Sequence, residues 1–548
     1  MNTRIKSPLL FFILIGCFIF SFGQGNHELP RLVSTNGSTQ LYVDKKPFLV
    51  LGGELGNSST SNLDYMRPIW AKLRSMHLNT VLAPVYWELM EPAEGQFDFT
   101  LVASMIAGAR KNDLKLVLLW FGAWKNSMSC YAPAWVKTNQ QKFERAKDSK
   151  GNGLEILSAL NKDNLKADVN AFTALMKYIR AVDADLNTVI MIQVENEIGM
   201  LTEAREYTDA ANRAFNSRVP AELINYLKTN KEKLVPEFFT VWEKNGFATN
   251  GSWEDIFGKG LATDEIFQAW QYAKYSNELA DAGKKVYDIP MFVNAALNYR
   301  NVDPGKYPSA GPLPHLMDIW QAGAPRIDFL SPDFYNPYFR KYCDLYVRKN
   351  NPFFIPEIRF EPGNEAKVFY AVGHYKAMGF SPFSIESTDS ADYPLGLPIS
   401  KSYDILNQLS PVILQHQATN NIEGVLLDSS IQKQEIIMGN YKLTVMHEYT
   451  LGWSPGAKKA GWPESGGLII QTASDEFIIA GTGIVVTFSL ASEAKKSVGI
   501  LQADEGQYVN GKWKPGRRMN GDQDHQGRHI RIAGKEFGIQ QVKLYQYK

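Results

Sequence analysis

The chain has 548 residues but only three cysteines, and it lacks the patterns that hold metals or nucleotides. Cys17 lies in the apolar N-terminus, which leaves Cys130 and Cys343 far apart in the sequence. Two such cysteines form no disulfide framework, although whether both thiols are free stays open. Neither has metal-ligand spacing around it, and no Gly-rich phosphate loop follows a predicted strand. The sequence therefore predicts no metal and no cofactor.

The chain also has little excess charge. Lysine plus arginine number 58 and aspartate plus glutamate 57, a formal net charge of +1, and no long run of like charge occurs. This balance gives no basic field for nucleic acid. Apolar residues make up 45% of the chain, enough for a large core. Aromatic residues make up 12%, which suits sugar stacking and large cores alike.

The N-terminus has the pattern of a signal peptide, which we predict over residues 1–23. Two basic residues precede the apolar run Leu9 to Phe20, and Ser21 to Gly23 offers a small-x-small cleavage site. The apolar run is too short for a stable membrane span. The segment that ends at Cys17 also resembles a lipobox, which would attach a lipid there, but the apolar run continues past it. We expect simple cleavage and export to the periplasm or the extracellular space.

Short apolar segments alternate with helical patterns between residues 40 and 400. Buried strands that alternate with helices form parallel sheets, and eight of them form a (β/α)8 TIM barrel, which we predict within residues 24–409. After about residue 410, short strands separated by turn residues predict an all-β sandwich domain over 410–548. The expected barrel strands are 47–51, 78–84, 114–121, 188–194, 289–293, 328–330, 352–355 and 380–385. The expected helices are 62–76, 99–112, 163–182 and 365–378, with a helix-rich segment over 203–283.

Two glutamates stand out because each follows a predicted buried strand. Glu197 ends the string Val194-Glu-Asn-Glu, and Glu357 follows the seventh strand. The carboxyl ends of barrel strands share one rim, so we expect both side chains there. Two carboxyl groups roughly 5–5.5 Å apart can act on a glycosidic bond as nucleophile and as acid/base. We predict Glu197 and Glu357 as the catalytic pair.

The strings that carry these residues resemble glycoside hydrolase family 35, the β-galactosidases, within the clan A barrel glycosidases. The resemblance implies that Glu197, preceded by Asn196, is the acid/base and that Glu357 is the nucleophile. The C-terminal domain resembles the accessory β-domain of one bacterial branch. The chain differs from the family pattern at Ile198 and in the segment Trp120 to Trp124. The matching strings are Gln193-Val-Glu-Asn-Glu-Ile-Gly199, Pro356-Glu357, Gly52-Gly-Glu54 and Trp87-Glu-Leu-Met-Glu-Pro92.

The predicted substrate-binding residues lie after the strands, on the same rim. Asn196 can form a hydrogen bond with the sugar 2-hydroxyl, a contact that strengthens in the transition state. For the acidic members the alternative is an ion pair with Arg359, and for the aromatic members it is packing in the core or rim. Glu195 is expected to be buried and hydrogen-bonded. The full predicted set is Asn196, Glu54, Tyr86, Trp87, Trp120, Tyr335 and Glu386.

The sequence thus predicts an exported, retaining exo-β-glycosidase that needs no cofactor, with β-galactose as the favoured terminal sugar and a carbohydrate as its partner. One alternative is the same machinery acting on β-glucose, β-mannose or arabinopyranose. Another is a catalytically silent carbohydrate-binding barrel, and the presence of both carboxyl groups argues against it. The linkage and the oligomeric state stay open.

Overall fold

The computed structural model describes residues 28–297, 302–348, 350–387, 396–492 and 496–548. The predicted signal peptide, with its lipobox at Cys17, lies outside these residues and stays a prediction. Within the described ranges, no helix has the length and apolar character that a bilayer span requires.

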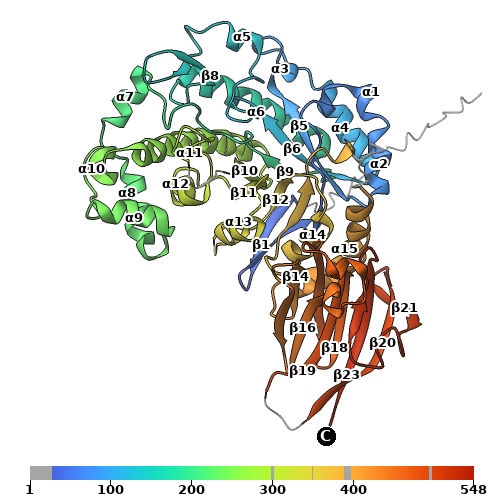
Figure 1. Cartoon of the computed structure of the whole chain (residues 1–548). Coiled ribbons are helices and arrows are strands. Elements are labelled where there is room, and N and C mark those ends of the chain that lie inside the picture. Colours follow the sequence, from blue (N-terminus) through green and yellow to red (C-terminus); the bar gives the residue numbers. More distant parts are fainter. Residues whose placement is uncertain (1–27, 298–301, 349, 388–395, 493–495) are drawn as a thin grey trace, which may run out of the picture.

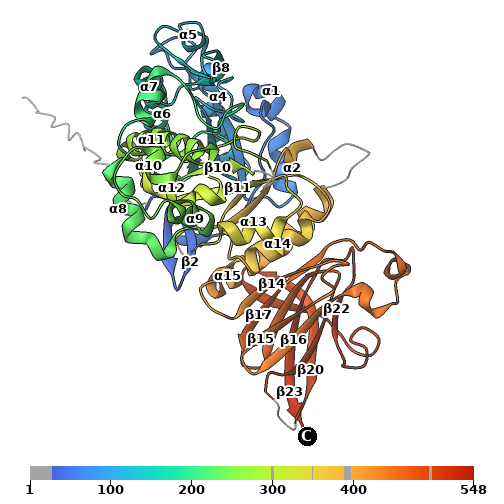
Figure 2. The same cartoon turned by 60° about the vertical axis from the view of Figure 1, so that its left-hand side comes forward.

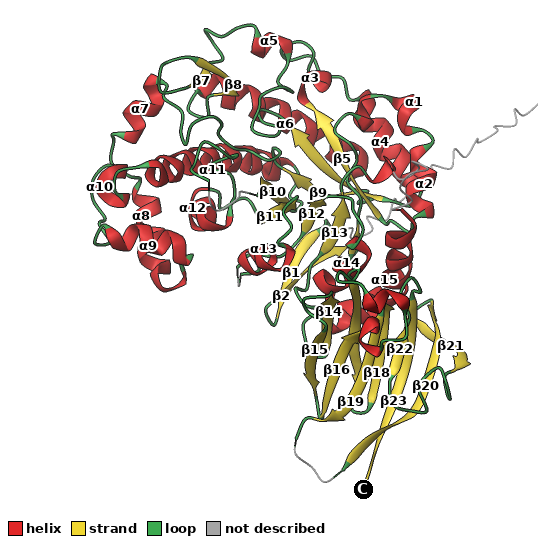
Figure 3. Ribbon diagram, in the orientation of Figure 1, coloured by secondary structure: helices red, strands yellow, loops and turns green. Residues whose placement is uncertain are grey.

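The first part of the chain forms a barrel of eight parallel strands with helices around it, which confirms the predicted fold (Figures 1 and 3). Backbone hydrogen bonds close the barrel between the strands that come first and second in the sequence. Leu82 N donates to the Gly53 oxygen at 2.9 Å, and Leu55 N donates to the Leu82 oxygen at 3.0 Å. The strands are, in order around the barrel, β4 (Val50–Leu51), β13 (Gly379–Pro382), β12 (Ile355–Ile358), β11 (Phe329–Phe334), β10 (Met291–Ala296), β9 (Val189–Gln193), β6 (Lys115–Phe121) and β5 (Thr80–Tyr86).

The barrel strands are apolar because both of their faces are buried. In β6 every residue after Lys115 is buried. Continuous apolar runs of this kind are typical of parallel strands that are covered by helices. Inside the barrel, the rings of Phe292 and Phe329 stack with centroids 5.1 Å apart, and Phe354 meets both rings edge-on. These residues fill the interior as a packed core.

An antiparallel sheet that the sequence did not predict precedes the barrel. It consists of β1 (Arg31–Thr35), β2 (Ser38–Val43) and β3 (Lys46–Phe48). The predicted strand 47–51 is therefore two strands, because its first residues pair with β2 and only Val50–Leu51 enter the barrel. Leu41 and Val43 of β2 join the apolar core of the barrel interior. The sheet thus extends that core beyond the barrel strands.

The helices match most predicted segments, with one break. The predicted helix 62–76 is divided into α1 (Leu63–Met66) and α2 (Ile69–Ser75), because Pro68 lacks the N–H that would continue the ladder. The short hairpin of β7 (Arg145–Lys147) and β8 (Gly153–Leu157) was not predicted. The other helices up to the barrel's end are α3 (Trp87–Met90), α4 (Thr100–Lys111), α5 (Ala134–Lys137), α6 (Lys162–Asp183), α7 (Asp209–Phe215), α8 (Ala221–Asn230), α9 (Pro236–Lys244), α10 (Trp253–Phe257), α11 (Leu261–Val286), α12 (Met317–Gly323), α13 (Phe339–Tyr346) and α14 (Asn364–Gly373).

The C-terminal part is a sandwich of two antiparallel sheets (Figure 2). The six-stranded sheet contains β14 (Ile422–Leu427), β17 (Ser465–Ala473), β18 (Glu476–Thr482), β23 (Gly538–Tyr547), β20 (Ser497–Val509) and β21 (Lys512–Arg518). The four-stranded sheet contains β15 (Lys433–Met438), β16 (Tyr441–His447), β19 (Ile484–Leu490) and β22 (Ile530–Ile532). Strands β20, β21 and β22 were missing from the sequence prediction, because β20 and β21 carry many exposed residues and no run of buried apolar ones.

Helices α14 and α15 (Gly396–His416) lie between the barrel and the sandwich (Figures 1 and 2). Helix α15 spans residues 409 and 410, where the sequence predicts the domain boundary. Leu426 and Leu468 belong to the same apolar cluster as the barrel helices, so one core crosses between the two parts. The backbones approach closely there, since a Cβ on Gly424 would lie 2.6 Å from the Phe369 oxygen.

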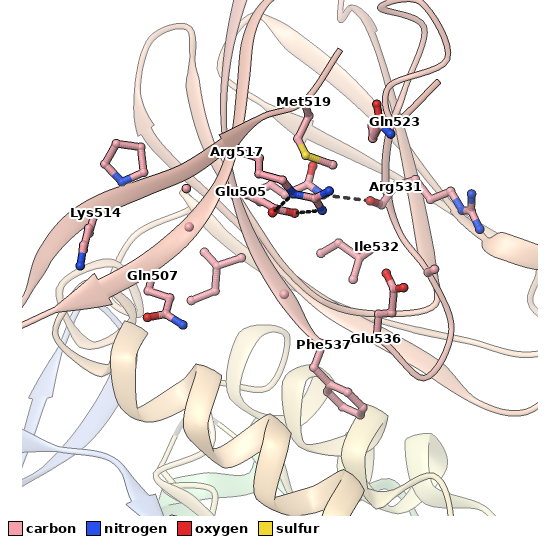
Figure 4. Close-up of a pocket in the computed structure, with 17 residues that line it drawn as sticks. Glu505, Gln507, Lys514, Arg517, Met519, Gln523, Arg531, Ile532, Glu536 and Phe537 are labelled. Atoms are coloured by element: carbon pink, nitrogen blue, oxygen red, sulfur yellow. Dashed lines mark hydrogen bonds and ion pairs between the residues drawn. The ribbon is translucent and has the colours of Figure 1, made fainter. Parts of the chain in front are cut away.

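A cleft of about 650 Å³ in the sandwich is lined by residues of β20, β21, β22 and β23 (Figure 4). Arg517 and Glu505 form an ion pair in its lining, and Lys401 of α15 lies 5.5 Å from the centre of the Phe537 ring. None of the predicted catalytic or substrate-binding residues lines this cleft.

Candidate active site

Four buried carboxyl groups come together at the carboxyl ends of the barrel strands. Glu54 follows β4, Glu197 follows β9, and Asp333 and Glu357 are paired neighbours on β11 and β12. Their exposed fractions are 0%, 4%, 0% and 3%. Burying acidic groups together is unfavourable unless they are neutralised, paired or used. This cluster contains both glutamates of the predicted catalytic pair.

Glu357 is held by a tyrosine from the neighbouring strand. The Tyr335 hydroxyl donates a hydrogen bond to Glu357 Oε1. The Glu357 carboxyl group also shares a hydrogen bond with the Glu54 carboxyl group. The Arg359 guanidinium lies 5.5 Å from the centre of the Tyr335 ring. The structure thus brings Tyr335 to the predicted nucleophile, as the sequence suggested.

Glu197 is fixed from both its backbone and its side chain. Its φ of 44° lies in the left-handed region, which a non-glycine residue adopts only where its surroundings hold it. The Glu197 N–H donates to Asn294 Oδ1 at 2.9 Å, and Asn294 Nδ2 donates to Asp333 Oδ2 at 2.6 Å. The Asn126 amide donates to Glu197 Oε2. These contacts aim the carboxyl group into the cluster.

The electrostatics divide the two glutamates between different roles. Burial, and then the nearby Glu357 carboxylate, raise the pKa of Glu197 to about 7. A carboxyl group with this pKa holds its proton in much of the protein near neutral pH and can act as a general acid. When Glu357 loses its negative charge, one cause of the raised pKa disappears. Glu197 then becomes a better base for the second step.

Glu54 and Asp333 are buried acids whose surroundings favour the protonated, uncharged form. Burial and the charge of Glu357 raise the pKa of both groups well above their ordinary values. A hydrogen bond between the Glu54 and Glu357 carboxyl groups also raises the pKa of Glu54. The position of Glu54 beside Glu357 is compatible with the predicted contact to substrate. No ion pair with Arg359 is formed by Glu54 or Glu386 in the described part of the chain.

Asn196 is paired with a buried lysine that the sequence analysis did not single out. Lys125 Nζ donates to Asn196 Oδ1 at 2.8 Å, and only 3% of Lys125 is exposed. The Asn196 Nδ2 atom is buried and has no hydrogen-bond partner among the described residues. A donor is therefore available for the sugar hydroxyl that the prediction assigns to Asn196. A lysine directly after the apolar, aromatic segment 116–124 was the available signal.

Glu195 is buried and hydrogen-bonded, as predicted. Its Oε2 accepts from the Trp124 N–H at 2.8 Å. Burial and the adjacent Asp168 carboxyl raise the pKa of Glu195 well above its ordinary value. Asp168 accepts from Trp120 Nε1 at 2.9 Å and from the Tyr275 hydroxyl at 3.1 Å. This acid pair lies behind the 195–197 loop and braces it.

Glu386 and Tyr86 lie together on the side of the site formed by the loop after β4. Glu386 Oε1 accepts from Gly56 N at 2.8 Å and from the Ser59 hydroxyl. The Tyr86 oxygen accepts from the neighbouring Thr60 hydroxyl at 2.9 Å. One carboxyl oxygen of Glu386 has no hydrogen-bond partner in the described part of the chain.

The structure does not bring Trp87 and Trp120 to the carboxyl cluster. Both side chains have no exposed surface. Their indole N–H groups are satisfied within the core, Trp87 by Glu91 at 2.7 Å and Trp120 by Asp168 at 2.9 Å. Trp120 points away from the barrel interior and packs against Phe172 of α6, because alternate residues of a strand point to opposite faces, and Trp87 at the start of α3 packs against Trp120. The prediction that they stack on a sugar has no support from this arrangement.

No cluster of three or more histidine, cysteine, aspartate or glutamate side chains has metal-binding geometry within the described ranges. Cys130 is exposed, Cys343 is buried, and both are free thiols.

Two parts of the chain are similar to known protein families. Residues 61–257 match the glycoside hydrolase 42 family, described as beta-galactosidase. This match includes Asn196 and Glu197 and ends before Glu357. Residues 399–531 match a family described as a domain of unknown function, DUF5597. Over the first segment the chain is similar to a clan A glycoside hydrolase, whereas the predicted membership of family 35 is not shown.

Among curated proteins, a beta-galactosidase of Xanthomonas manihotis is 29% identical over 182 residues, which make up 32% of this chain and 28% of that protein. The chain thus matches less than a third of that relative's length. Among solved structures, the beta-galactosidase of Bacillus circulans sp. alkalophilus is similar with a TM-score of 0.46 and 15% sequence identity. The matched part covers 67% of this chain and 57% of that structure's chain. The beta-galactosidase of the psychrophilic Marinomonas ef1 has a TM-score of 0.45 and 14% identity, covering 68% and 62%.

Proposed function

We propose that this protein is a retaining exo-β-glycosidase of clan A, and that its preferred substrate is a terminal β-galactoside. The finer assignment to glycoside hydrolase family 35 is part of the proposal and rests on the strings around Glu197 and Glu357. The observation that carries it is the convergence of these two glutamates, one held by a hydroxyl and one with a pKa raised to about 7.

The proposed reaction has two steps. Glu357 attacks the anomeric carbon while Glu197 donates its proton to the departing glycosidic oxygen, which leaves a glycosyl ester on Glu357. Glu197, now an anion, accepts a proton from a water molecule that attacks the same carbon, and the ester breaks. Tyr335 stabilises the carboxylate of Glu357 before the attack, and Asn196 Nδ2 donates to the 2-hydroxyl.

A panel of aryl β-glycosides tests this proposal. We expect the wild type to hydrolyse the galactoside faster than the glucoside, mannoside and arabinopyranoside. Glu357→Gln removes the nucleophile and should lower kcat about 10⁴-fold. Faster hydrolysis of another sugar would keep the chemistry and change the substrate. Absence of turnover on every sugar, together with unchanged sugar affinity in Glu357→Gln, would favour the silent-binder alternative.

A further inference from the structure

Residues 124–127, which follow β6, run parallel to the loop 195–197 that contains Asn196 and Glu197. Trp124 N–H donates to Glu195 Oε2, and Asn196 N–H donates to the Trp124 oxygen at 3.3 Å. Further along both segments, the Ser127 N–H donates to the backbone oxygen of Glu197 at 3.1 Å. This short parallel ladder places two consecutive side chains, Lys125 and Asn126, opposite Asn196 and Glu197.

Each of these two side chains makes a contact that orients its partner. A lysine ammonium can only donate, so the atom of Asn196 that faces Lys125 at 2.8 Å must be the oxygen. The Asn196 NH₂ group is thereby turned away from Lys125. The Asn126 amide nitrogen likewise faces Glu197 Oε2, so that oxygen accepts. In this orientation of the Asn126 amide, the proton of a neutral Glu197 resides on Oε1.

Lys125 is also the cation of the carboxyl cluster. Its ammonium lowers the pKa of Glu54, Glu197 and Asp333, each of which burial and Glu357 raise. Its own burial is eased by the Phe121 ring, whose centre lies 5.0 Å from Nζ.

We propose that Lys125 and Asn126 form a clamp that positions the acid/base loop: Lys125 orients Asn196 toward the sugar 2-hydroxyl, and Asn126 fixes Glu197 Oε1 as the oxygen that delivers the proton. The clamp directly follows the segment Trp120 to Trp124, where this chain departs from the pattern of family 35. Both are positioning residues, since they act through Asn196 and Glu197. The inference rests on the proposed function.

The clamp predicts changes that a merely structural role would not produce. Lys125→Met removes a charge and a donor while it keeps the length of the side chain. The pKa of Glu197 then rises, since burial and the Glu357 carboxylate still raise it and the Lys125 ammonium no longer lowers it. The basic limb of the pH dependence of kcat/KM should move to higher pH by about one unit. Asn126→Ala should move the limb in the same direction.

A second readout isolates the orientation of Asn196. An aryl 2-deoxyglycoside lacks the hydroxyl that Asn196 contacts in the wild-type protein. In Lys125→Met this contact is already weakened, so the ratio of kcat/KM for the parent sugar over the 2-deoxy sugar should fall about tenfold. The matched control is Lys142→Met, a lysine paired with Glu94 and outside the site, which should change neither the limb nor the ratio.

A titration without turnover separates the clamp from the proposed function. Carbon NMR of protein with labelled glutamate side chains, with Glu197→Gln to assign the signal, gives the pKa of Glu197 directly. A higher value in Lys125→Met and Asn126→Ala supports the clamp even if no tested glycoside is hydrolysed. An unchanged Glu197 titration in both folded variants overturns it. Absence of activity in the wild type alone would overturn the proposed function.

Discussion

At the scale of single residues, the site is governed by carboxyl groups that burial keeps from ionising. Glu197, Glu54 and Asp333 all have pKa values raised by burial and by Glu357. Their arrangement favours proton donation near neutral pH, and it makes both activity and stability depend on pH.

The raised pKa of Glu197 predicts the pH dependence of the reaction. The acid must be protonated in the free enzyme, so kcat/KM should fall as pH rises through about 7. The measurement is a pH profile on the preferred aryl glycoside. A profile that stays flat to pH 9 would remove Glu197 from the role of acid.

The raised pKa of Glu54 predicts an effect on stability. The folded state keeps the Glu54 proton that the unfolded chain releases above its ordinary pKa of 4.5, so stability falls as pH rises above that value. Glu54→Gln removes this loss. The Tm of Glu54→Gln minus the Tm of the wild type should be larger at pH 8 than at pH 5, by about 2 °C or more. Turnover should decrease in this variant. Calorimetry at both pH values measures the difference, and an equal shift at the two values would contradict the assigned charge state.

At the scale of elements, alternation of apolar strands with helices predicted the barrel, because both faces of its strands are buried. The same sequence pattern failed to predict strands in which exposed and buried residues are mixed. The segment 47–51 contains parts of two strands, and β20 and β21 have exposed residues throughout much of their length. The two glutamates of the proposed catalytic pair were predictable because each lies at the carboxyl end of a barrel strand. Lys125 and Asn126 were not, because their partners come from another strand.

The contact of α14 with β14 makes a prediction for Gly424. A Cβ there would lie 2.6 Å from the Phe369 oxygen and 2.9 Å from the His374 nitrogen, so backbone must shift. Gly424→Ala should destabilise the protein by about 1–3 kcal/mol. Gly461→Ala in the same domain has open space around it and serves as the control. Thermal unfolding of both variants measures this, and equal Tm values would argue against the close approach.

At the scale of the whole molecule, the barrel and the sandwich share a continuous core. The α14 residues Val368, Phe369 and Val372 have no exposed surface, and the helix packs on β14 and β17. The sandwich therefore covers apolar surface of the barrel, whatever else its cleft does.

Removal of residues 417–548 should expose this apolar surface. We expect the shortened protein to bind a hydrophobic dye and to unfold at a lower temperature than the full chain. Dye fluorescence and thermal unfolding of the two proteins measure the effect. A shortened protein with unchanged Tm and no dye binding would show that the shared core contributes little.

The stereochemistry of hydrolysis tests the central claim most directly. Proton NMR during cleavage of an aryl β-galactoside identifies the anomer that forms first. Attack by Glu357 followed by attack of water predicts that β-galactose appears first and then mutarotates. First appearance of α-galactose would mean a single displacement, and it would contradict the assignment of Glu357 as the nucleophile.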